Sequence, residues 1–244
     1  MNKVVYIFLL LLSTTIYSYA NSEINDPYEK SNRIIHNFND KVDVLILRPV
    51  SVGYSILPNP LEEGISNALQ NVSEPINFTN FVFQGEIGKA FKSISRFLIN
   101  STIGLIGLID VAEKINLKKN NTDFGFTLKS WGIKEGPYLV VPFFGPRSTR
   151  HLTGSIIDMV TNPLNYLLKD EDSAIRISPS LLYAVSARSG NMETIDNLRE
   201  TSIDYYTSLK SIYIQNRFSE EINEGNDYML DDFFQSLDEE YINE

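Results

Sequence analysis

Two histidines, His36 and His151, are the side chains best suited to proton transfer or metal binding near neutral pH. Neither has a second histidine four residues away, the spacing that places two zinc ligands on one face of a helix. The chain contains no cysteine, so thiolate metal sites and thiol nucleophiles are excluded. We therefore predict no metal and no cofactor, and we interpret His36 as a structural or solvated residue.

Two short patterns approach catalytic motifs without completing them. Ser155 follows Gly154, but the G-x-S-x-G turn that exposes a nucleophilic serine is not completed. Before Gly88 and Lys89, Phe83 occupies the position where a phosphate-binding loop has its first glycine. With no catalytic constellation, we predict that the protein is not an enzyme, and a lipid-cleaving hydrolase is a lesser alternative.

The net charge of −10 is concentrated at the C-terminus. Residues 218–244 contain acidic residues but neither lysine nor arginine, and the rest of the chain is neutral. A neutral body lacks the basic face that nucleic-acid binding requires, so nucleic acid is excluded as a partner. We interpret residues 218–244 as a solvated acidic tail, with docking of a basic partner as the alternative.

The N-terminus has the features of a secretory signal peptide. Lys3 precedes an apolar run from Val4 to Leu12, and residues 18–20 supply the small residues of a cleavage site. This run is shorter than the roughly 20 residues that a bilayer-spanning helix needs. We predict that residues 1–20 are a signal peptide and that the protein is exported, with an uncleaved anchor as the alternative.

The body of the chain carries repeated helix signals. Apolar residues recur at spacings of three and four, and proline often follows a residue that can cap a helix. We predict helices that begin at Asp26-Pro27, Asn59-Pro60, Ser73-Glu74-Pro75, Glu86, Ser178-Pro179 and Asp204, the first of them ending at Arg48-Pro49.

Strand-type alternation is confined to residues 138–141 and, more weakly, to Arg176-Ile177. Two such short runs are too little for a sheet with a face to bury. The predicted fold class is therefore all-α, with one irregular insertion between Gly132 and Arg150.

The most apolar internal segment runs from Phe97 to Ala112. As a helix it would measure roughly 24 Å, which is less than the roughly 30 Å of a hydrocarbon core. Gly104 and Gly107 each weaken a continuous helix by roughly 1 kcal/mol relative to alanine. We expect a buried helix with a glycine-permitted turn, or an element that is half sunk in one leaflet of a membrane or lines an apolar cavity.

Six blocks, taken together and in order, resemble the MlaA/VacJ family. They are NDPYEKSNRIIHNFNDKVD (25–43), LRPV (47–50), LPNPLEEGISNALQNVSEPINFTNFVFQG (57–85), RFLINSTIGLIGLIDVA (96–112), DFGFTLKSWGIKEGPYLVVPFFGPRSTR (123–150) and DNLRETSIDYYTSLKSIYIQNR (196–217). We therefore take residues 21–217 as a MlaA/VacJ-like helical domain between the signal peptide and the acidic tail.

The resemblance implies a ring-like helical single domain with one irregular hairpin loop, lying on the periplasmic side of the outer membrane. It implies that phospholipids misplaced in the outer leaflet pass through a channel in the ring, without catalysis. The implied partners are phospholipid, an outer-membrane porin trimer and a soluble periplasmic lipid carrier.

The resemblance also implies functional residues. On the first helix, a lipid path is implied at Asn37, Phe38 and Asn39. The hairpin-loop residues are Trp131, Gly132, Gly136, Pro137, Tyr138 and Pro142. The apolar segment supplies the membrane-facing candidates Phe97, Leu98, Ile103, Leu105, Ile106 and Leu108.

Two features depart from the family pattern. Most members begin with a lipidated cysteine, and this chain contains none, so attachment would rest on apolar helices and porin contact, or the protein would be partly free in the periplasm. Lys134 and Glu135 stand where relatives are often glycine-rich, which puts the mobility of the hairpin in question. The main alternative function is a porin-associated or surface-exposed interaction protein without transport activity.

Overall fold

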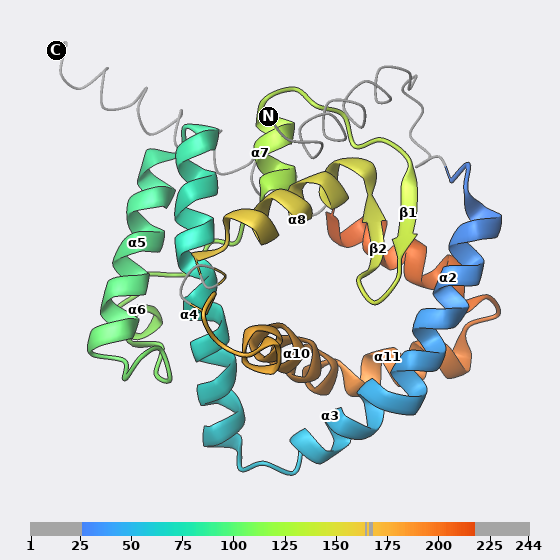
Figure 1. Cartoon of the computed structure of the whole chain (residues 1–244), viewed down its shortest axis with the longest axis horizontal. Coiled ribbons are helices and arrows are strands. Elements are labelled where there is room, and N and C mark those ends of the chain that lie inside the picture. The colour runs from blue at the N-terminus through green and yellow to red at the C-terminus, as the bar shows by residue number, and fades with distance from the viewer. Residues whose placement is uncertain (1–25, 164, 166–167, 218–244) are drawn as a thin grey trace, which may run out of the picture. The chain divides into compact units, whose positions relative to one another are not determined.

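The computed structural model describes residues 26–163, 165 and 168–217. The predicted signal peptide and the predicted acidic tail lie outside the described residues. The chain divides after Asp196 into two compact units. The described part is mostly helical and contains one two-stranded hairpin (Figure 1), which confirms the predicted helical class and the hairpin.

The first helical region continues past its predicted end. It consists of α2 (Glu29–Val42), a π-helical turn η1 (Asp43–Leu47) and α3 (Arg48–Tyr54). The prediction of an end at Arg48-Pro49 was wrong because Pro49 lies in the first turn of α3, where a helix needs no backbone donor. The wide η1 turn closes when Arg48 donates its N–H to the carbonyl of Asp43.

A single long helix, α4 (Asn59–Gln84), replaces the two helices predicted from Asn59 and Ser73. Pro75 lies inside α4, at a cost of about 3 kcal/mol for a helix interior. The packing of α4 along α5 (Ile87–Thr102) offsets this cost. Gly85 ends α4 with φ 83°, a left-handed conformation that glycine adopts without strain.

The predicted apolar segment is a helix only up to Thr102, where α5 ends. The chain then turns through residues 103–109 into α6 (Val111–Lys114) and, after an extended stretch, α7 (Phe124–Ser130). Asp110 caps α6 and Asp123 caps α7, each by accepting a backbone N–H three residues ahead.

The hairpin pairs β1 (Tyr138–Val141) with β2 (Gly145–Ser148) in antiparallel register, Tyr138 opposite Ser148. The strand predicted at residues 138–141 is confirmed. Helix α8 (Thr149–Thr161) follows β2 directly and packs against α7. The contact requires glycine, because a Cβ on Gly154 would come within 2.2 Å of the Gly125 backbone nitrogen.

The next helix, α10 (Ser173–Gly190), begins before its predicted start at Ser178 and includes Arg176-Ile177, which was wrongly predicted as a strand. Proline is tolerated inside α10 because the Ser178 hydroxyl donates to the Ile175 carbonyl at 2.8 Å, the acceptor that Pro179 cannot use. Helix α10 packs on α3 and α4.

Helix α11 (Met192–Thr201) crosses the division between the units. In the second unit residues 205–217 are helical, and Asp204 accepts the Thr207 N–H and hydroxyl at 3.3 and 2.7 Å. This contact confirms the predicted cap. Among the described residues, no helix is both long and apolar enough to cross a membrane.

Candidate functional site

Polar side chains are buried on both α4 and α5, and those on α4 contact α5, α7 and α8. The buried polar residues are Asn71, Glu74, Asn77 and Asn80 on α4 and Ser93, Arg96 and Asn100 on α5. They recur at spacings of three and four, so each helix turns a polar stripe inward. Helices on the surface of water-soluble proteins normally turn an apolar stripe inward instead.

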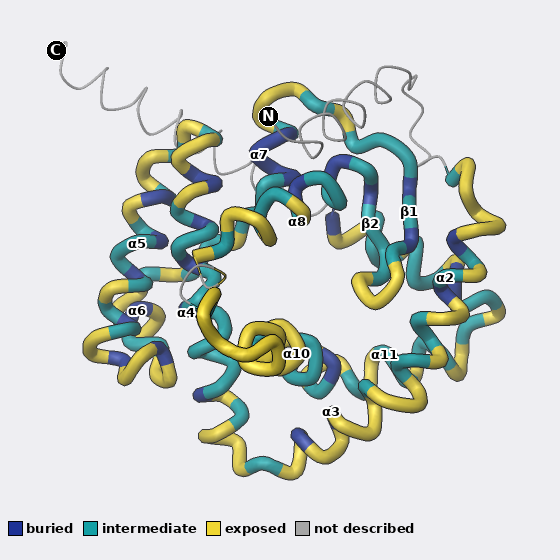
Figure 2. The backbone as a smooth tube through the Cα atoms, viewed as in Figure 1, coloured by how far each residue is buried: buried dark blue, intermediate teal, exposed yellow. Residues whose placement is uncertain are grey.

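Large apolar side chains are exposed on α5 and on α2, two helices of which Figure 2 shows exposed stretches. On α5 and the turn after it, the exposed residues are Ile87, Phe91, Leu98, Ile103, Leu105, Ile106, Leu108 and Ile109. On α2 and η1 they are Ile34, Phe38, Val44, Leu45 and Ile46. Exposed apolar surface of this extent marks contact with lipid or with another protein.

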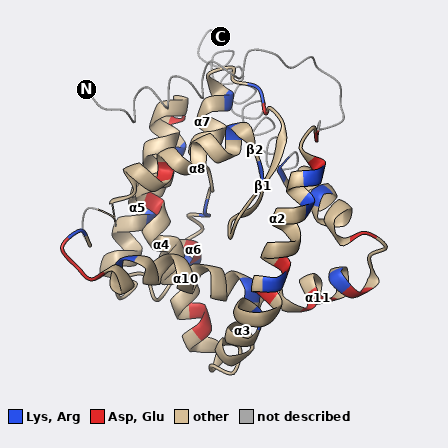
Figure 3. Ribbon diagram, turned by 45° about the vertical axis from the view of Figure 1, so that its right-hand side comes forward, with Lys and Arg blue, Asp and Glu red and all other residues tan. Residues whose placement is uncertain are grey.

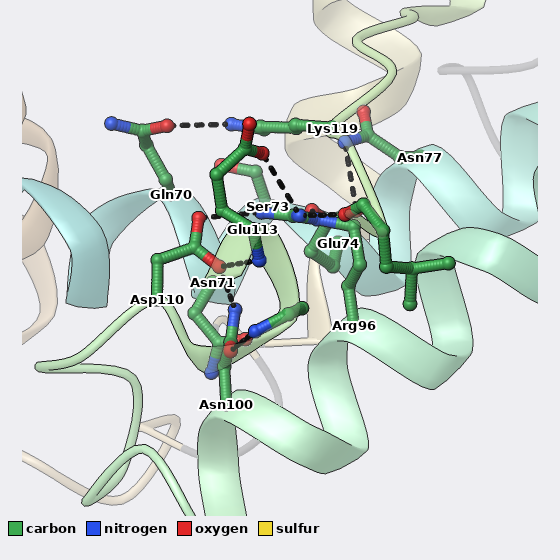
Figure 4. A network of polar contacts seen from close by, with 12 residues as sticks. Gln70, Asn71, Ser73, Glu74, Asn77, Arg96, Asn100, Asp110, Glu113 and Lys119 are labelled. Carbon is green, nitrogen blue, oxygen red and sulfur yellow. Dashed lines mark hydrogen bonds and ion pairs between the residues drawn. The ribbon is translucent and has the colours of Figure 1, made fainter. Parts of the chain in front are cut away.

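Arg96 is the centre of the buried polar network (Figure 4). Its Nε contacts Glu74 Oε1 at 2.8 Å, and its Nη2 contacts Asp110 Oδ2 at 2.7 Å. Its Nη1 donates to the carbonyl of Leu117. The Arg96 and Glu74 side chains are 3% and 1% exposed. One guanidinium therefore joins α4, the start of α6 and the segment after α6 to α5.

Asn100 extends this network toward α6. Its Nδ2 donates to Asp110 Oδ1 at 3.0 Å, and its Oδ1 accepts the Ala112 N–H at 2.9 Å. Burial disfavours the charge on Asp110, but the hydrogen bonds from the Glu113 N–H, Arg96 and Asn100 outweigh it and lower the pKa of Asp110. Asp110 is therefore held ionised, and the chain is fixed where residues 103–109 end.

A second ion-pair cluster links α10 to η1. Figure 3 shows acidic and basic residues meeting where α2 leads into α3. Arg188 contacts Asp43 at 2.8 Å and Asp196 at 2.6 Å, and Arg48 contacts the other Asp196 oxygen at 2.9 Å. The Arg188 side chain is 3% exposed. This cluster positions α2 and α3 against α10.

Two asparagines on α2 hold the hairpin through paired hydrogen bonds. Asn32 donates to the Tyr138 carbonyl at 3.1 Å and accepts the Val140 N–H at 2.9 Å. Seven residues later, Asn39 donates to the Val141 carbonyl at 3.0 Å and accepts the Phe143 N–H at 2.8 Å. The two amides stand on one face of α2, where Asn32 binds β1 and Asn39 binds the end of β1 and the turn after it.

The predicted lipid-path residues are separated by the structure. Asn39 binds the hairpin turn, and Phe38 packs edge-to-face on Phe143 with ring centroids 5.3 Å apart. Asn37 is exposed and makes no side-chain hydrogen bond among the described residues. His36 is buried on the same helix, in keeping with its structural interpretation.

The predicted hairpin-loop residues lie at several points between the end of α7 and the hairpin turn. Trp131 lies just after α7, where it stacks edge-to-face on Phe83 and Phe124 and donates its indole N–H to the Phe83 carbonyl. Gly132 and Gly136 have positive φ and precede β1. The other three residues are Pro137, the buried Tyr138 of β1 and the exposed Pro142 of the turn.

Glu135 fixes the segment that leads into the hairpin. It pairs with Arg150, whose side chain is 5% exposed. Arg150 also donates to the Ile133 carbonyl at 3.1 Å and, from its backbone, to the Glu135 carbonyl at 3.0 Å. Glu135 therefore supplies an anchor that glycine would not.

Five of the six membrane-facing candidates are exposed, from 48% for Leu108 to 81% for Ile106. Phe97 is partly buried. Sequence reasoning missed Asn32 and the Arg96 network. The polar spacing 71, 74, 77 and 80, paired with 93, 96 and 100, was the signal that could have identified the network.

Comparison with known proteins gives consistent matches. The MlaA lipoprotein family model matches residues 24–220. The intermembrane phospholipid transport system lipoprotein MlaA of Haemophilus influenzae is 32% identical over 209 residues, 84% of this chain and 82% of that protein. The Escherichia coli protein of the same name is 32% identical over 196 residues, 78% and 76% of the two chains.

Two further matches extend the comparison. An uncharacterized protein of Rickettsia typhi is 35% identical over 191 residues, 78% of this chain and 75% of that protein. A solved structure that concerns the structural basis for maintenance of bacterial outer membrane lipid asymmetry superposes with a TM-score of 0.68. It is 30% identical and covers 79% of this chain and 96% of its own.

Proposed function

The chain belongs to the MlaA lipoprotein family, and we propose that it is a non-catalytic phospholipid conduit in the periplasmic leaflet of the outer membrane. In this role it removes phospholipid misplaced in the outer leaflet and so maintains lipid asymmetry. Two relatives are named as lipoproteins of an intermembrane phospholipid transport system, and they support the lipid substrate.

The observation that carries the proposal is the reversed distribution of polarity. Most of the buried side chains on α4 and α5 are polar, whereas Phe91 on α5, Ile106 in the turn after α5 and Leu45 in η1 are exposed. In water this arrangement exposes apolar area at about 25 cal/mol per Å². In one leaflet the same area contacts acyl chains, and the buried polar groups remain satisfied by one another.

The lipid path in this proposal runs beside α2 and the hairpin, within a ring-like arrangement of helices. A phospholipid needs polar groups for its headgroup and apolar groups for its chains. Asn37 and Asn39 supply amides on either side of Phe38, and Phe38 and Phe143 supply an aromatic pair at the hairpin turn. The contacts of Asn39 and Glu135 hold the hairpin in place. They favour a fixed hairpin that forms part of the wall of the lipid path, rather than a mobile one.

The partners in this proposal are a porin trimer beside the protein and a soluble periplasmic carrier that accepts the lipid. The exposed apolar residues of α5 and of the turn after it would face acyl chains or the apolar wall of the porin. Contact with acyl chains and contact with the porin wall both require exposed apolar side chains, and these residues supply them.

The proposal predicts that the protein, purified from its native membrane in mild detergent, carries phospholipid and co-purifies with a porin. Mass spectrometry of the lipid and protein in the sample measures both. Incubation with labelled phospholipid should release neither fatty acid nor headgroup, because no catalytic constellation is expected. Release of either product would favour a hydrolase, and a sample free of phospholipid would count against the conduit.

A further inference from the structure

A chain of hydrogen bonds, hereafter the Asp158 chain, joins Asp158 of α8, Asn80 of α4, Thr127 of α7, Gln84 of α4 and Thr122. The Asn80 amide donates to Asp158 Oδ1 at 2.9 Å, and the Thr127 hydroxyl donates to Asn80 Oδ1 at 2.9 Å. Gln84 Nε2 donates to the hydroxyls of Thr127 and Thr122 at 3.1 and 2.8 Å. From Gln84 to the carboxylate, every donor therefore points toward Asp158.

The middle of the Asp158 chain is closed to water. Thr127 is 0% exposed and Asn80 is 1% exposed. A buried hydroxyl or amide must pair with its neighbours, because water cannot replace a lost partner. A change of charge at the carboxylate therefore changes which group donates and which accepts along the chain.

Asp158 is bound by neutral donors. Its second oxygen accepts the Phe124 N–H at 2.9 Å, and among the described residues no lysine, arginine or histidine forms an ion pair with it. Burial raises the pKa of Asp158 above its ordinary value, and the charge of Asp123 adds to this, whereas the bonds from Phe124 and Asn80 oppose it. Asp158 therefore takes up a proton at a higher pH than an exposed aspartate does.

Asp123 connects Asp158 to a second titratable group. Its Oδ2 lies 3.9 Å from Nε2 of His151, two turns before Asp158 on α8, so protonation of His151 would lessen the repulsion between the carboxylates. Lys129 lies in the last turn of α7, at the other end of that helix from Asp123. Glu74 of α4 is already paired within the buried polar network.

We propose that the Asp158 chain is a proton switch with two complete arrangements, the described one for ionised Asp158 and its reverse for protonated Asp158. In the reverse arrangement the Asp158 O–H donates to Asn80 Oδ1, and a half-turn of the Asn80 amide directs Nδ2 to the Thr127 oxygen. A half-turn of the Gln84 amide then lets Oε1 accept from the hydroxyls of Thr127 and Thr122. Each half-turn exchanges an oxygen for a nitrogen of nearly the same size, so both arrangements keep these groups paired.

The switch makes the joint between three helices depend on pH, and it does not rest on the proposed function. Helix α7 packs on both α4 and α8 (Figure 1), and α8 follows β2 of the hairpin directly. Because the folded protein holds the proton to a higher pH than the unfolded chain does, the contribution of Asp158 to stability is greatest below the ordinary pKa of aspartate. It falls as the pH rises through the raised pKa.

Nuclear magnetic resonance of the full chain in detergent micelles tests the switch. The carbon-13 shift of the Asp158 carboxyl and the nitrogen-15 shifts of the Asn80 and Gln84 amides are followed from about pH 3 to about pH 8. We expect all of these signals to change with one midpoint, at a higher pH than the midpoint of the exposed Asp170. A shared midpoint for Asp158 and Asp170 would overturn the proton site. Constant amide shifts while Asp158 titrates would overturn the reversal.

Asp158→Asn places a neutral donor at the same position. The Asn80 and Gln84 signals should then stay at their wild-type acid values at every pH, whereas Asp170→Asn, the matched control, should keep the wild-type titration. The melting temperature of Asp158→Asn should exceed that of the wild type by an amount that grows as the pH rises, since only the wild type carries the buried charge. A difference that does not change with pH would contradict the proposal.

Discussion

Arg96→Met is expected to lower the free energy of unfolding by about 3–5 kcal/mol. The substitution leaves the Glu74 carboxylate, 1% exposed, without its cationic partner. It also removes the donors to Asp110 and to the Leu117 carbonyl, so only the Asn100 contacts still hold α6 to α5. Chemical denaturation in detergent micelles, followed by circular dichroism, measures the change.

A double variant distinguishes a buried charge from general damage to packing. Because much of the loss arises from the unpaired carboxylate, Arg96→Met with Glu74→Gln should be more stable than Arg96→Met alone. Arg33→Met, which breaks an exposed ion pair with Glu29, should cost less than about 1 kcal/mol. Arg96 would not be the centre of the buried polar network if Arg33→Met and Arg96→Met lowered the free energy of unfolding by the same amount.

Asn39→Ala is expected to detach the hairpin turn from α2 and to impair phospholipid removal. It deletes both amide contacts, to the Val141 carbonyl and from the Phe143 N–H, each worth about 1 kcal/mol. The open population of the turn should therefore rise by at least about tenfold. Hydrogen exchange at the Phe143 amide measures this opening, and outer-leaflet phospholipid in complemented cells measures the functional loss.

Asn37→Ala is the matched control, because Asn37 is exposed on the same helix and makes no side-chain hydrogen bond among the described residues. It should leave the exchange rate of the Phe143 amide unchanged. If Asn39→Ala speeds hydrogen exchange at the Phe143 amide but phospholipid removal stays normal, the Asn39 contacts stabilise the fold and have no part in the lipid path.

Local signals in the sequence predicted much of the helical fold and the hairpin. Glu86 marks the start of α5, Asp204 caps the last described helix, and the alternation at residues 138–141 is β1. The predicted helix boundaries were wrong where the prediction relied on proline. Pro75 and Pro179 lie inside helices because packing and a neighbouring hydroxyl offset the lost backbone bond, and neither effect is visible from a local pattern.

The polar network could not be assigned from periodicity alone. The spacing of Ile87, Phe91 and Leu98 indicates one apolar face of α5, and in water that face would be the buried one. The structure exposes it and buries Ser93, Arg96 and Asn100. Periodicity separates two faces of a helix, but the medium around the protein decides which of them turns inward.

The contacts of Asn32 and Asn39 with the hairpin join residues more than 100 positions apart in the chain, and no local spacing predicts them. Asn32 meets Val140, and Asn39 meets Phe143. The family resemblance implies a role for Asn39 but not for Asn32.

The most direct test of the conduit is the amount of phospholipid in the outer leaflet of cells that lack the gene. An amine-reactive reagent that cannot cross the outer membrane labels phosphatidylethanolamine there, and mass spectrometry quantifies the product. We predict an increase on deletion, reversed by the wild-type gene and incompletely by the gene with Asn39→Ala. The same amount of labelled lipid with and without the gene would contradict the proposed function.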